Sequence, residues 1–94
     1  MEQILIDFTK VEIETIDRLK ETVDASKIIG NNIYYGASDI ALTDIGRTVY
    51  EKGVVELNAN QLHIIRQMLL NSQNLTGVLK NGLRVLFDKI VLTN

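Results

Sequence analysis

The side chains best suited to catalysis are few in this 94-residue sequence. His63 is the only histidine, and Glu56 and Gln67 are its candidate neighbours. A catalytic histidine needs a positioned partner, and a zinc site needs several ligands. With no cysteine in the chain, nothing in the sequence completes either kind of site. We therefore expect His63 on the solvent side of its helix, and we expect no metal and no cofactor.

An acidic run is the second chemical feature of the sequence. Its members are Glu12, Glu14, Asp17, Glu21 and Asp24. On a strand, Glu12 and Glu14 point to one face, and paired carboxylates can bind metal or act in acid–base catalysis. The alternative is an ordinary half-buried strand, because Val11 and Ile13 point to the opposite face. The second interpretation accounts for the whole pattern, so we expect no metal here.

Motifs for nucleophilic catalysis and nucleotide binding are absent from the sequence. No serine lies in a G-x-S-x-G context, and the glycines form neither G-x-G-x-x-G nor a P-loop. The sequence therefore predicts a protein that is not an enzyme.

The composition indicates one small globular domain over residues 1–94. Hydrophobic residues make up 46% of the chain and charged residues 23%, with 12 Ile, 12 Leu and 8 Val to build a core. No N-terminal run has the pattern of a signal peptide and no run of about 18 apolar residues occurs, so we expect neither a leader nor a membrane span. The absence of cysteine fits a reducing compartment. We expect a cytoplasmic protein that does not enter a membrane.

Charge is distributed unevenly along the chain, which raises the question of nucleic-acid binding. Residues 1–59 carry 6 basic and 11 acidic side chains, whereas residues 60–94 carry 4 basic and 1 acidic. The segment Leu42–Arg47 also resembles the stretch that follows the wing in winged-helix regulators. A recognition helix ahead of it needs Arg, Lys, Asn or Gln, and Ile28–Tyr35 offers only Asn31 and Asn32. A nucleic-acid-binding regulator is thus the alternative function, and we expect no nucleic-acid partner.

Alternation of apolar and polar residues predicts strands near the N-terminus. Residues 4–9 and 11–14 have this period-2 pattern, and residues 20–23 form a returning strand after a turn at 17–19. The competing interpretation is a helix over residues 10–23. The first predicts an α+β fold with an N-terminal β-hairpin or two short strands followed by three to four packed helices; the second predicts an all-α bundle.

Capping residues divide the rest of the chain into helices. Asp24 is expected to cap a helix over residues 25–35, with Gly36 in the left-handed conformation after it. Thr43 is expected to cap a helix over residues 44–52 that stops at Gly53. Residues 54–57 are expected to be extended, and Asn58 opens a helix with Gln61 at the capping-box position. The last helix is predicted from residue 75 or 76 to residue 92.

The predicted last helix is apolar over an arc of roughly 200°, wider than one buried face needs. Its main stripe is Val78, Leu79, Leu83, Leu86 and Ile90. Val85, Phe87 and Leu92 lie on the flanks and are candidate interface residues. Tyr34 and Tyr35 are two further candidates, because tyrosine is favoured in binding surfaces and adjacent helix positions cannot both face the core. These residues predict a homo-oligomer or a protein partner.

A spacing pattern over residues 11–70 resembles small uncharacterised proteins of bacterial prophages and other mobile elements. It is carried by Val11–Asp17, Glu21–Lys27, Ile29–Tyr34, Asp39–Ile40, Gly46–Tyr50 and Gly53–Leu57. The resemblance implies an accessory role with no activity and no functional residue attached. Together with the apolar last helix, it predicts a small non-catalytic protein-interaction protein, a phage or mobile-element accessory or assembly factor.

Overall fold

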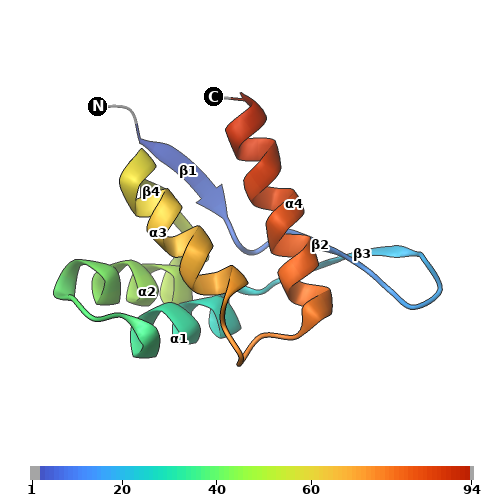
Figure 1. Ribbon diagram of the computed structural model, residues 1–94, viewed down its shortest axis with the longest axis horizontal. Helices are drawn as coiled ribbons and strands as arrows, with labels where there is room; N and C mark the ends of the chain where they lie inside the picture. The colour runs from blue at the N-terminus through green and yellow to red at the C-terminus, as the bar shows by residue number, and fades with distance from the viewer. Residues whose placement is uncertain (1–2, 94) are drawn as a thin grey trace.

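A computed structural model describes residues 3–93 of the chain, and the side chains of residues 3–90. The elements follow the order β1 (Ile4–Asp7), β2 (Val11–Glu14), β3 (Lys20–Val23), α1 (Ser26–Gly36), α2 (Ile40–Lys52), β4 (Val54–Leu57), α3 (Ala59–Leu70) and α4 (Gly77–Thr93). The α+β prediction, with N-terminal strands followed by packed helices, is confirmed (Figure 1). The all-α alternative is wrong, because residues 11–14 and 20–23 are strands.

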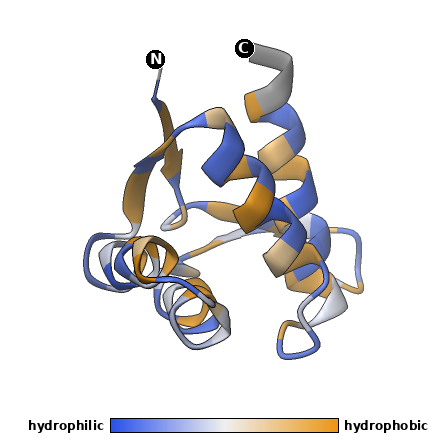
Figure 2. Cartoon of the chain, turned by 60° about the vertical axis from the view of Figure 1, so that its left-hand side comes forward, coloured by the Kyte–Doolittle hydropathy of each residue, from blue (hydrophilic) through white to orange (hydrophobic). Residues whose placement is uncertain are grey.

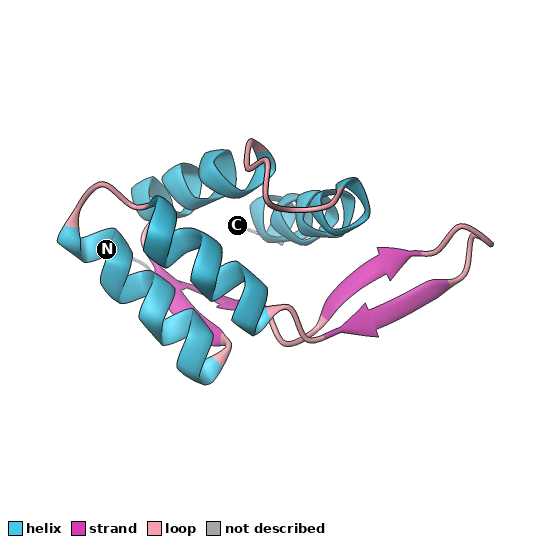
Figure 3. Cartoon of the chain, turned by 90° about the horizontal axis from the view of Figure 1, so that it is seen from below, coloured by secondary structure: helices cyan, strands magenta, loops and turns pink. Residues whose placement is uncertain are grey.

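The strands form two separate antiparallel pairs. β2 and β3 make the predicted hairpin, in which Val11 lies opposite Val23 and Glu14 opposite Lys20. The turn between them is closed by a hydrogen bond from the Thr15 N–H to the Leu19 carbonyl, 2.8 Å long. This ribbon extends away from the helices, and its tip exposes Ile16 to solvent (Figure 3). Half-buried Ile13 and Val23 anchor its base on the core.

The second pair joins β1 to β4, two segments about fifty residues apart in sequence. Ile4 lies opposite Leu57, and Asp7 lies opposite Val54. The backbone of Phe8 extends this connection, because its N–H donates to the Gly53 carbonyl and its carbonyl accepts from the Ala25 N–H. Phe8 therefore ties the start of α1 to the end of α2.

Side-chain capping sets the start of α2 but not that of α1. α1 begins at Ser26 with Ala25 as its N-cap residue and no side-chain cap, so the prediction that Asp24 caps this helix is wrong. Asp24 instead accepts the Ser26 N–H at 3.0 Å in the turn before the helix. Gly36 is the last residue of α1 and does not have the left-handed conformation expected of it. α2 begins at Ile40 and not at Asp44, because Asp39 is the cap and its Oδ1 accepts the Leu42 N–H at 2.9 Å. The prediction that Thr43 caps this helix is wrong.

The predicted stop and the predicted capping box are both confirmed. Gly53 ends α2 with φ 77°, a conformation that strains any residue with a Cβ. Asn58 accepts the Gln61 N–H, and the Gln61 side chain in turn accepts the Asn58 N–H. α4 begins at Gly77, and the hydroxyl of the preceding residue, Thr76, accepts the Leu79 N–H.

Glycines allow α1 and α2 to pack with their backbones in close approach. A Cβ added at Gly46 would lie 2.6 Å from the Tyr34 nitrogen and 3.1 Å from the Gly30 carbonyl oxygen. A Cβ at Gly30 would lie 2.6 Å from the nitrogen of Tyr50. Gly30 costs about 1 kcal/mol of helix propensity, and this close packing is the structural reason for a glycine there.

The core is one cluster of buried apolar side chains from all four helices and from β1, β2 and β4. Apolar and hydrophilic residues accordingly alternate along the helices (Figure 2). Phe8 and Phe87 form the centre of the core, with an edge-to-face contact at 6.3 Å between ring centroids and 70° between ring planes. α4 crosses β2 at Gly82, where a Cβ would approach the Glu12 carbonyl oxygen to 2.6 Å.

The buried side of α4 differs from the expected stripe. Leu83 and Phe87 are completely buried, and Leu79, Leu86 and Ile90 are partly buried against the core. Val78 is half-exposed, although its helix position predicts that it belongs to the main apolar stripe. Within residues 3–93, no helix has the length and apolar character needed to cross a membrane.

Candidate functional site

The most exposed aromatic side chain of the described residues lies on the outer side of α1. Tyr35 is 81% exposed, and Ile28 and Asn31 precede it on the same exposed side of the helix. These three residues are called the α1 face below. Lys27 is the single charged residue of α1, so the face itself carries no charge. Apolar and aromatic side chains without charge are the composition of interface centres, which are depleted in Lys, Glu and Asp.

Tyr34 lies beside Tyr35 and is held by α2. The two rings meet edge to face at 5.0 Å between centroids. Arg47 of α2 donates a hydrogen bond to the Tyr34 hydroxyl at 3.2 Å, and its guanidinium carbon lies 5.5 Å from the centre of the Tyr34 ring. The Tyr34 ring is therefore fixed between two helices and supports Tyr35 from the side.

A second cation, Lys27 of α1, holds the ring of Tyr50 near the end of α2. The Lys27 ammonium donates to the Tyr50 carbonyl at 2.8 Å and lies 4.1 Å from the centre of the Tyr50 ring. Cation–π contacts of this kind stabilise exposed rings by about 0.5–1 kcal/mol. A shallow groove of about 260 Å³ lies between these two ordered aromatic groups, and Gly30 and Gly46 form part of its lining because they carry no side chain.

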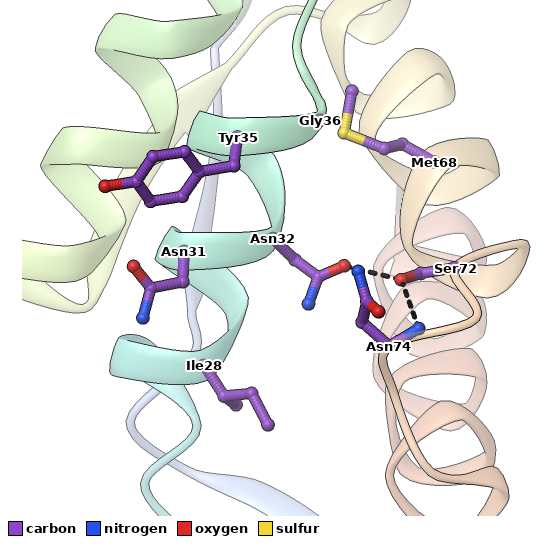
Figure 4. A pocket seen from close by; sticks show the side chains of 8 residues that line it. All are labelled: Ile28, Asn31, Asn32, Tyr35, Gly36, Met68, Ser72 and Asn74. Carbon is purple, nitrogen blue, oxygen red and sulfur yellow. Dashed lines mark hydrogen bonds between the residues drawn. The ribbon is translucent and has the colours of Figure 1, made fainter.

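The other side of α1 borders a groove that is rich in amide groups, which we call the amide groove. Its volume is about 520 Å³, within the range of ligand pockets. The eight lining residues include no charged side chain: Ile28, Asn31, Asn32, Tyr35, Gly36, Met68, Ser72 and Asn74. α1 supplies one wall, and the end of α3 with the following loop supplies the other (Figure 4). Asn31 and Tyr35 line both this groove and the one next to α2.

A short chain of hydrogen bonds connects the two walls of the amide groove. The Ser72 hydroxyl donates to Asn32 Oδ1 at 2.5 Å and accepts the Asn74 backbone N–H at 3.2 Å (Figure 4). Because the oxygen of the Asn32 amide faces Ser72, its NH₂ group is directed into the groove. The groove thus presents an oriented donor next to the adaptable apolar side chain of Met68.

The five predicted interface residues do not form one surface. Tyr34 and Tyr35 lie beside one another as described, whereas Val85 is 39% exposed and lines a different groove between α4 and β2. Phe87 is 0% exposed and packs on Phe8, so the expectation that it lies on an exposed flank is wrong. The side chain of Leu92 lies outside the described residues.

His63 is exposed on α3, as expected, and lines a further groove of about 640 Å³. Arg66 and Asp88 form an ion pair at 3.6 Å beside His63. The other residues that line the groove have apolar side chains: Ile4, Ala59, Leu62 and Ile90. Among residues 3–93, no three histidine or carboxylate side chains are grouped as a metal site would require.

The pKa values of two carboxyl groups are lowered, and both groups accept hydrogen bonds within local turns. The pKa of Asp7 is lowered because the hydroxyl and then the backbone N–H of Thr9 donate to it. The pKa of Asp24 is lowered in the same way by the hydroxyl and N–H of Ser26. These hydrogen bonds stabilise the ionised form of each carboxylate and fix the turn that contains it. A lowered pKa does not produce a general base near neutral pH.

Sequence reasoning did not identify the amide groove. The sequence offers Asn31 and Asn32 only as possible nucleic-acid contacts, and it predicts no site at residues 71–74. The available signal was the same in both segments, namely clustered uncharged polar residues. Asn32 and Ser72 are forty residues apart, however, and only the packing of α1 on α3 brings them together.

No protein-family model, no curated protein sequence and no solved structure matches the chain.

Proposed function

We propose that this chain is a small non-catalytic domain that binds another protein through the α1 face and the grooves beside it. The observation that carries the proposal is the uncharged, aromatic α1 face, in which Tyr35 is 81% exposed although its neighbours are held in place. On the resemblance in residues 11–70, the partner belongs to a phage or mobile element, and the domain acts as an accessory or assembly factor.

The side chains around Tyr35 are held in fixed positions, which supports a binding role. Arg47 fixes Tyr34, and Lys27 fixes Tyr50, so the surface next to Tyr35 is arranged before a partner arrives. Binding then costs less side-chain entropy than it would on a mobile surface. Ile40, which is 80% exposed at the start of α2, adds apolar area to the same pair of helices.

Site-specific photocrosslinking tests the proposal. A benzophenone amino acid replaces Tyr35 in cells that carry the natural partner, and a second variant carries it at Ile64, an exposed position of α3. We expect a discrete crosslinked protein from position 35 and none from position 64. Excess unlabelled wild-type protein should suppress the crosslink, whereas excess Tyr35→Glu protein should not.

Two results would contradict the proposal. One is a Tyr35→Glu protein that competes as well as the wild type. The other is a set of crosslinks that is the same from positions 35 and 64. Because Tyr35 is exposed and outside the core, both variants should keep the wild-type circular dichroism spectrum.

A further inference from the structure

The amide groove has the chemistry to recognise the main chain of a peptide. Each asparagine amide pairs an N–H donor with a C=O acceptor, the same two groups that a peptide unit presents. Asn31, Asn32 and Asn74 all line one groove of about 520 Å³. The amides of Asn32 and Asn74 lie between its walls, and the amide of Asn31 lies at its edge on the outer side of α1 (Figure 4). Ser72 is already engaged on both sides, which fixes Asn32 in one orientation (Figure 4).

The character of the lining decides which peptide fits. No charged side chain lines the groove, so a charged ligand would lose hydration without gaining a counter-ion. A nucleic acid is disfavoured for the same reason, because its affinity depends largely on cations at the phosphates. Ile28 and Met68 offer contacts to apolar side chains of any shape, since methionine adapts readily.

The backbone state of the peptide also follows from the amides. A helical peptide satisfies its own N–H and C=O groups along the helix and offers none to asparagine. An extended segment leaves them free. We propose that the amide groove binds an extended, uncharged peptide segment, held by hydrogen bonds from Asn31, Asn32 and Asn74 to its main chain. This rests on the proposed function and names the part of the partner that the site takes.

The experiment starts from a displayed library of random linear dodecapeptides selected on the folded, full-length chain. The peptide that binds best is synthesised and titrated into the labelled protein by NMR. We expect it to shift the side-chain amide signals of Asn31, Asn32 and Asn74. Methylation of single backbone nitrogens of the peptide should weaken binding about ten-fold, because each removes a main-chain donor. Conservative changes of its side chains should have smaller effects.

A double variant, Asn31→Ala with Asn74→Ala, should weaken binding at least ten-fold. It should keep the fold, because both residues are exposed and the Asn74 hydrogen bond is made by its backbone N–H. The matched control is Asn60→Ala with Asn81→Ala, which removes two exposed asparagines from α3 and α4. The control should bind as the wild type does.

Four outcomes would overturn the inference. The selection could yield no binding peptide, or the selected peptide could bind the two double variants with equal affinity. The peptide could bind as a helix, or a mixed single-stranded DNA oligonucleotide could shift the same side-chain amide signals. The crosslinking experiment is independent of these. If the crosslink at position 35 is competed equally by the wild type and by an Asn74→Ala protein, which is altered in the groove and not in the α1 face, the α1 face binds protein and this groove does not take part.

Discussion

Phe87 connects the last helix of the chain to Phe8, just after the first strand. The two rings pack edge to face, and both side chains are completely inaccessible to solvent. Burial of an aromatic side chain contributes roughly 2–3 kcal/mol, and an aromatic pair adds about 0.5–1.5 kcal/mol. Phe87 is therefore a folding residue, although its helix position alone had placed it on a flank.

Replacing Phe87 should destabilise the protein strongly. We expect Phe87→Ala to lower the free energy of unfolding by about 3–5 kcal/mol, because it leaves a cavity beside Phe8. Phe87→Glu should be unfolded, since a charge would be buried without a partner. Urea denaturation followed by circular dichroism measures both. Val85→Glu is the control, and a loss comparable to that of Phe87→Ala would mean that the two faces of α4 are assigned the wrong way round.

Asp24 gives the stability a dependence on pH. The hydrogen bonds from Ser26 lower its pKa, so the unfolded chain takes up a proton before the folded chain does as the pH falls. The contribution is complete above the unfolded pKa of about 3.9 and is lost as the pH drops through the lower, folded-state pKa. Asp24→Asn should reduce the loss of stability between pH 6 and pH 3.

Urea midpoints at the two pH values provide the measurement. Ser26→Ala removes the hydroxyl that contributes most to the lowered pKa, and it should reduce the pH dependence in the same direction. Asp7, with Thr9 as its donor, supplies the rest of the effect from these two turns. Unchanged pH dependence in both variants would show that the Asp24–Ser26 turn does not couple protonation to folding.

At the level of elements, the α1–α2 hairpin depends on glycine at the contact between the helices. Gly46 lies against the backbone of Tyr34, and Gly30 lies against the backbone of Tyr50. Any larger residue must separate the helices, which also carry Tyr34, Tyr35 and Arg47. The spacing of the candidate binding surface is thus set by the absence of two side chains beneath it.

Alanine at these glycines should cost stability despite its better helix propensity. We expect Gly46→Ala and Gly30→Ala each to destabilise the protein by about 1–3 kcal/mol through overpacking. Gly77→Ala is the matched control, because a Cβ there would meet no atom within 4 Å. It should be neutral or stabilising by up to about 1 kcal/mol. Thermal melts rank the three, and equal effects at all positions would contradict the close contact.

The elements also show which features can be predicted from sequence. Gly53 and the Asn58–Gln61 box were predicted because a cap is decided within four residues. The cap of α2 was misassigned because Asp39 and Thr43 both have capping side chains, and only the backbone at Asp39 is extended. The β1–β4 pairing and the amide groove depend on residues forty or more positions apart, which no local pattern reports.

For the whole molecule, the basic side chains are separated and several are engaged with partners on different surfaces. Lys20 pairs with Glu12 on the ribbon, Arg66 pairs with Asp88 between α3 and α4, and Lys27 and Arg47 contact tyrosines. The net charge is −2. A nucleic-acid surface needs several adjacent cations, because affinity rises with the number of counter-ions released.

We therefore expect no tight binding of DNA. A gel-shift titration with duplex DNA at low salt should show no saturable complex at sub-micromolar protein. A complex that forms there and weakens steeply with added salt would revive the regulator hypothesis. The Arg47→Ala protein would then serve to test whether the Leu42–Arg47 segment contributes.

The pairing of β1 with β4 imposes an order in time on the chain as a ribosome makes it. Synthesis delivers β1 about fifty residues before its partner strand β4, and Phe87 emerges later still. α1 and α2, by contrast, can pack against each other as soon as residue 52 has left the ribosome. The apolar segment around Ile6 and Phe8 is consequently the part of the nascent chain that must be shielded longest by other means.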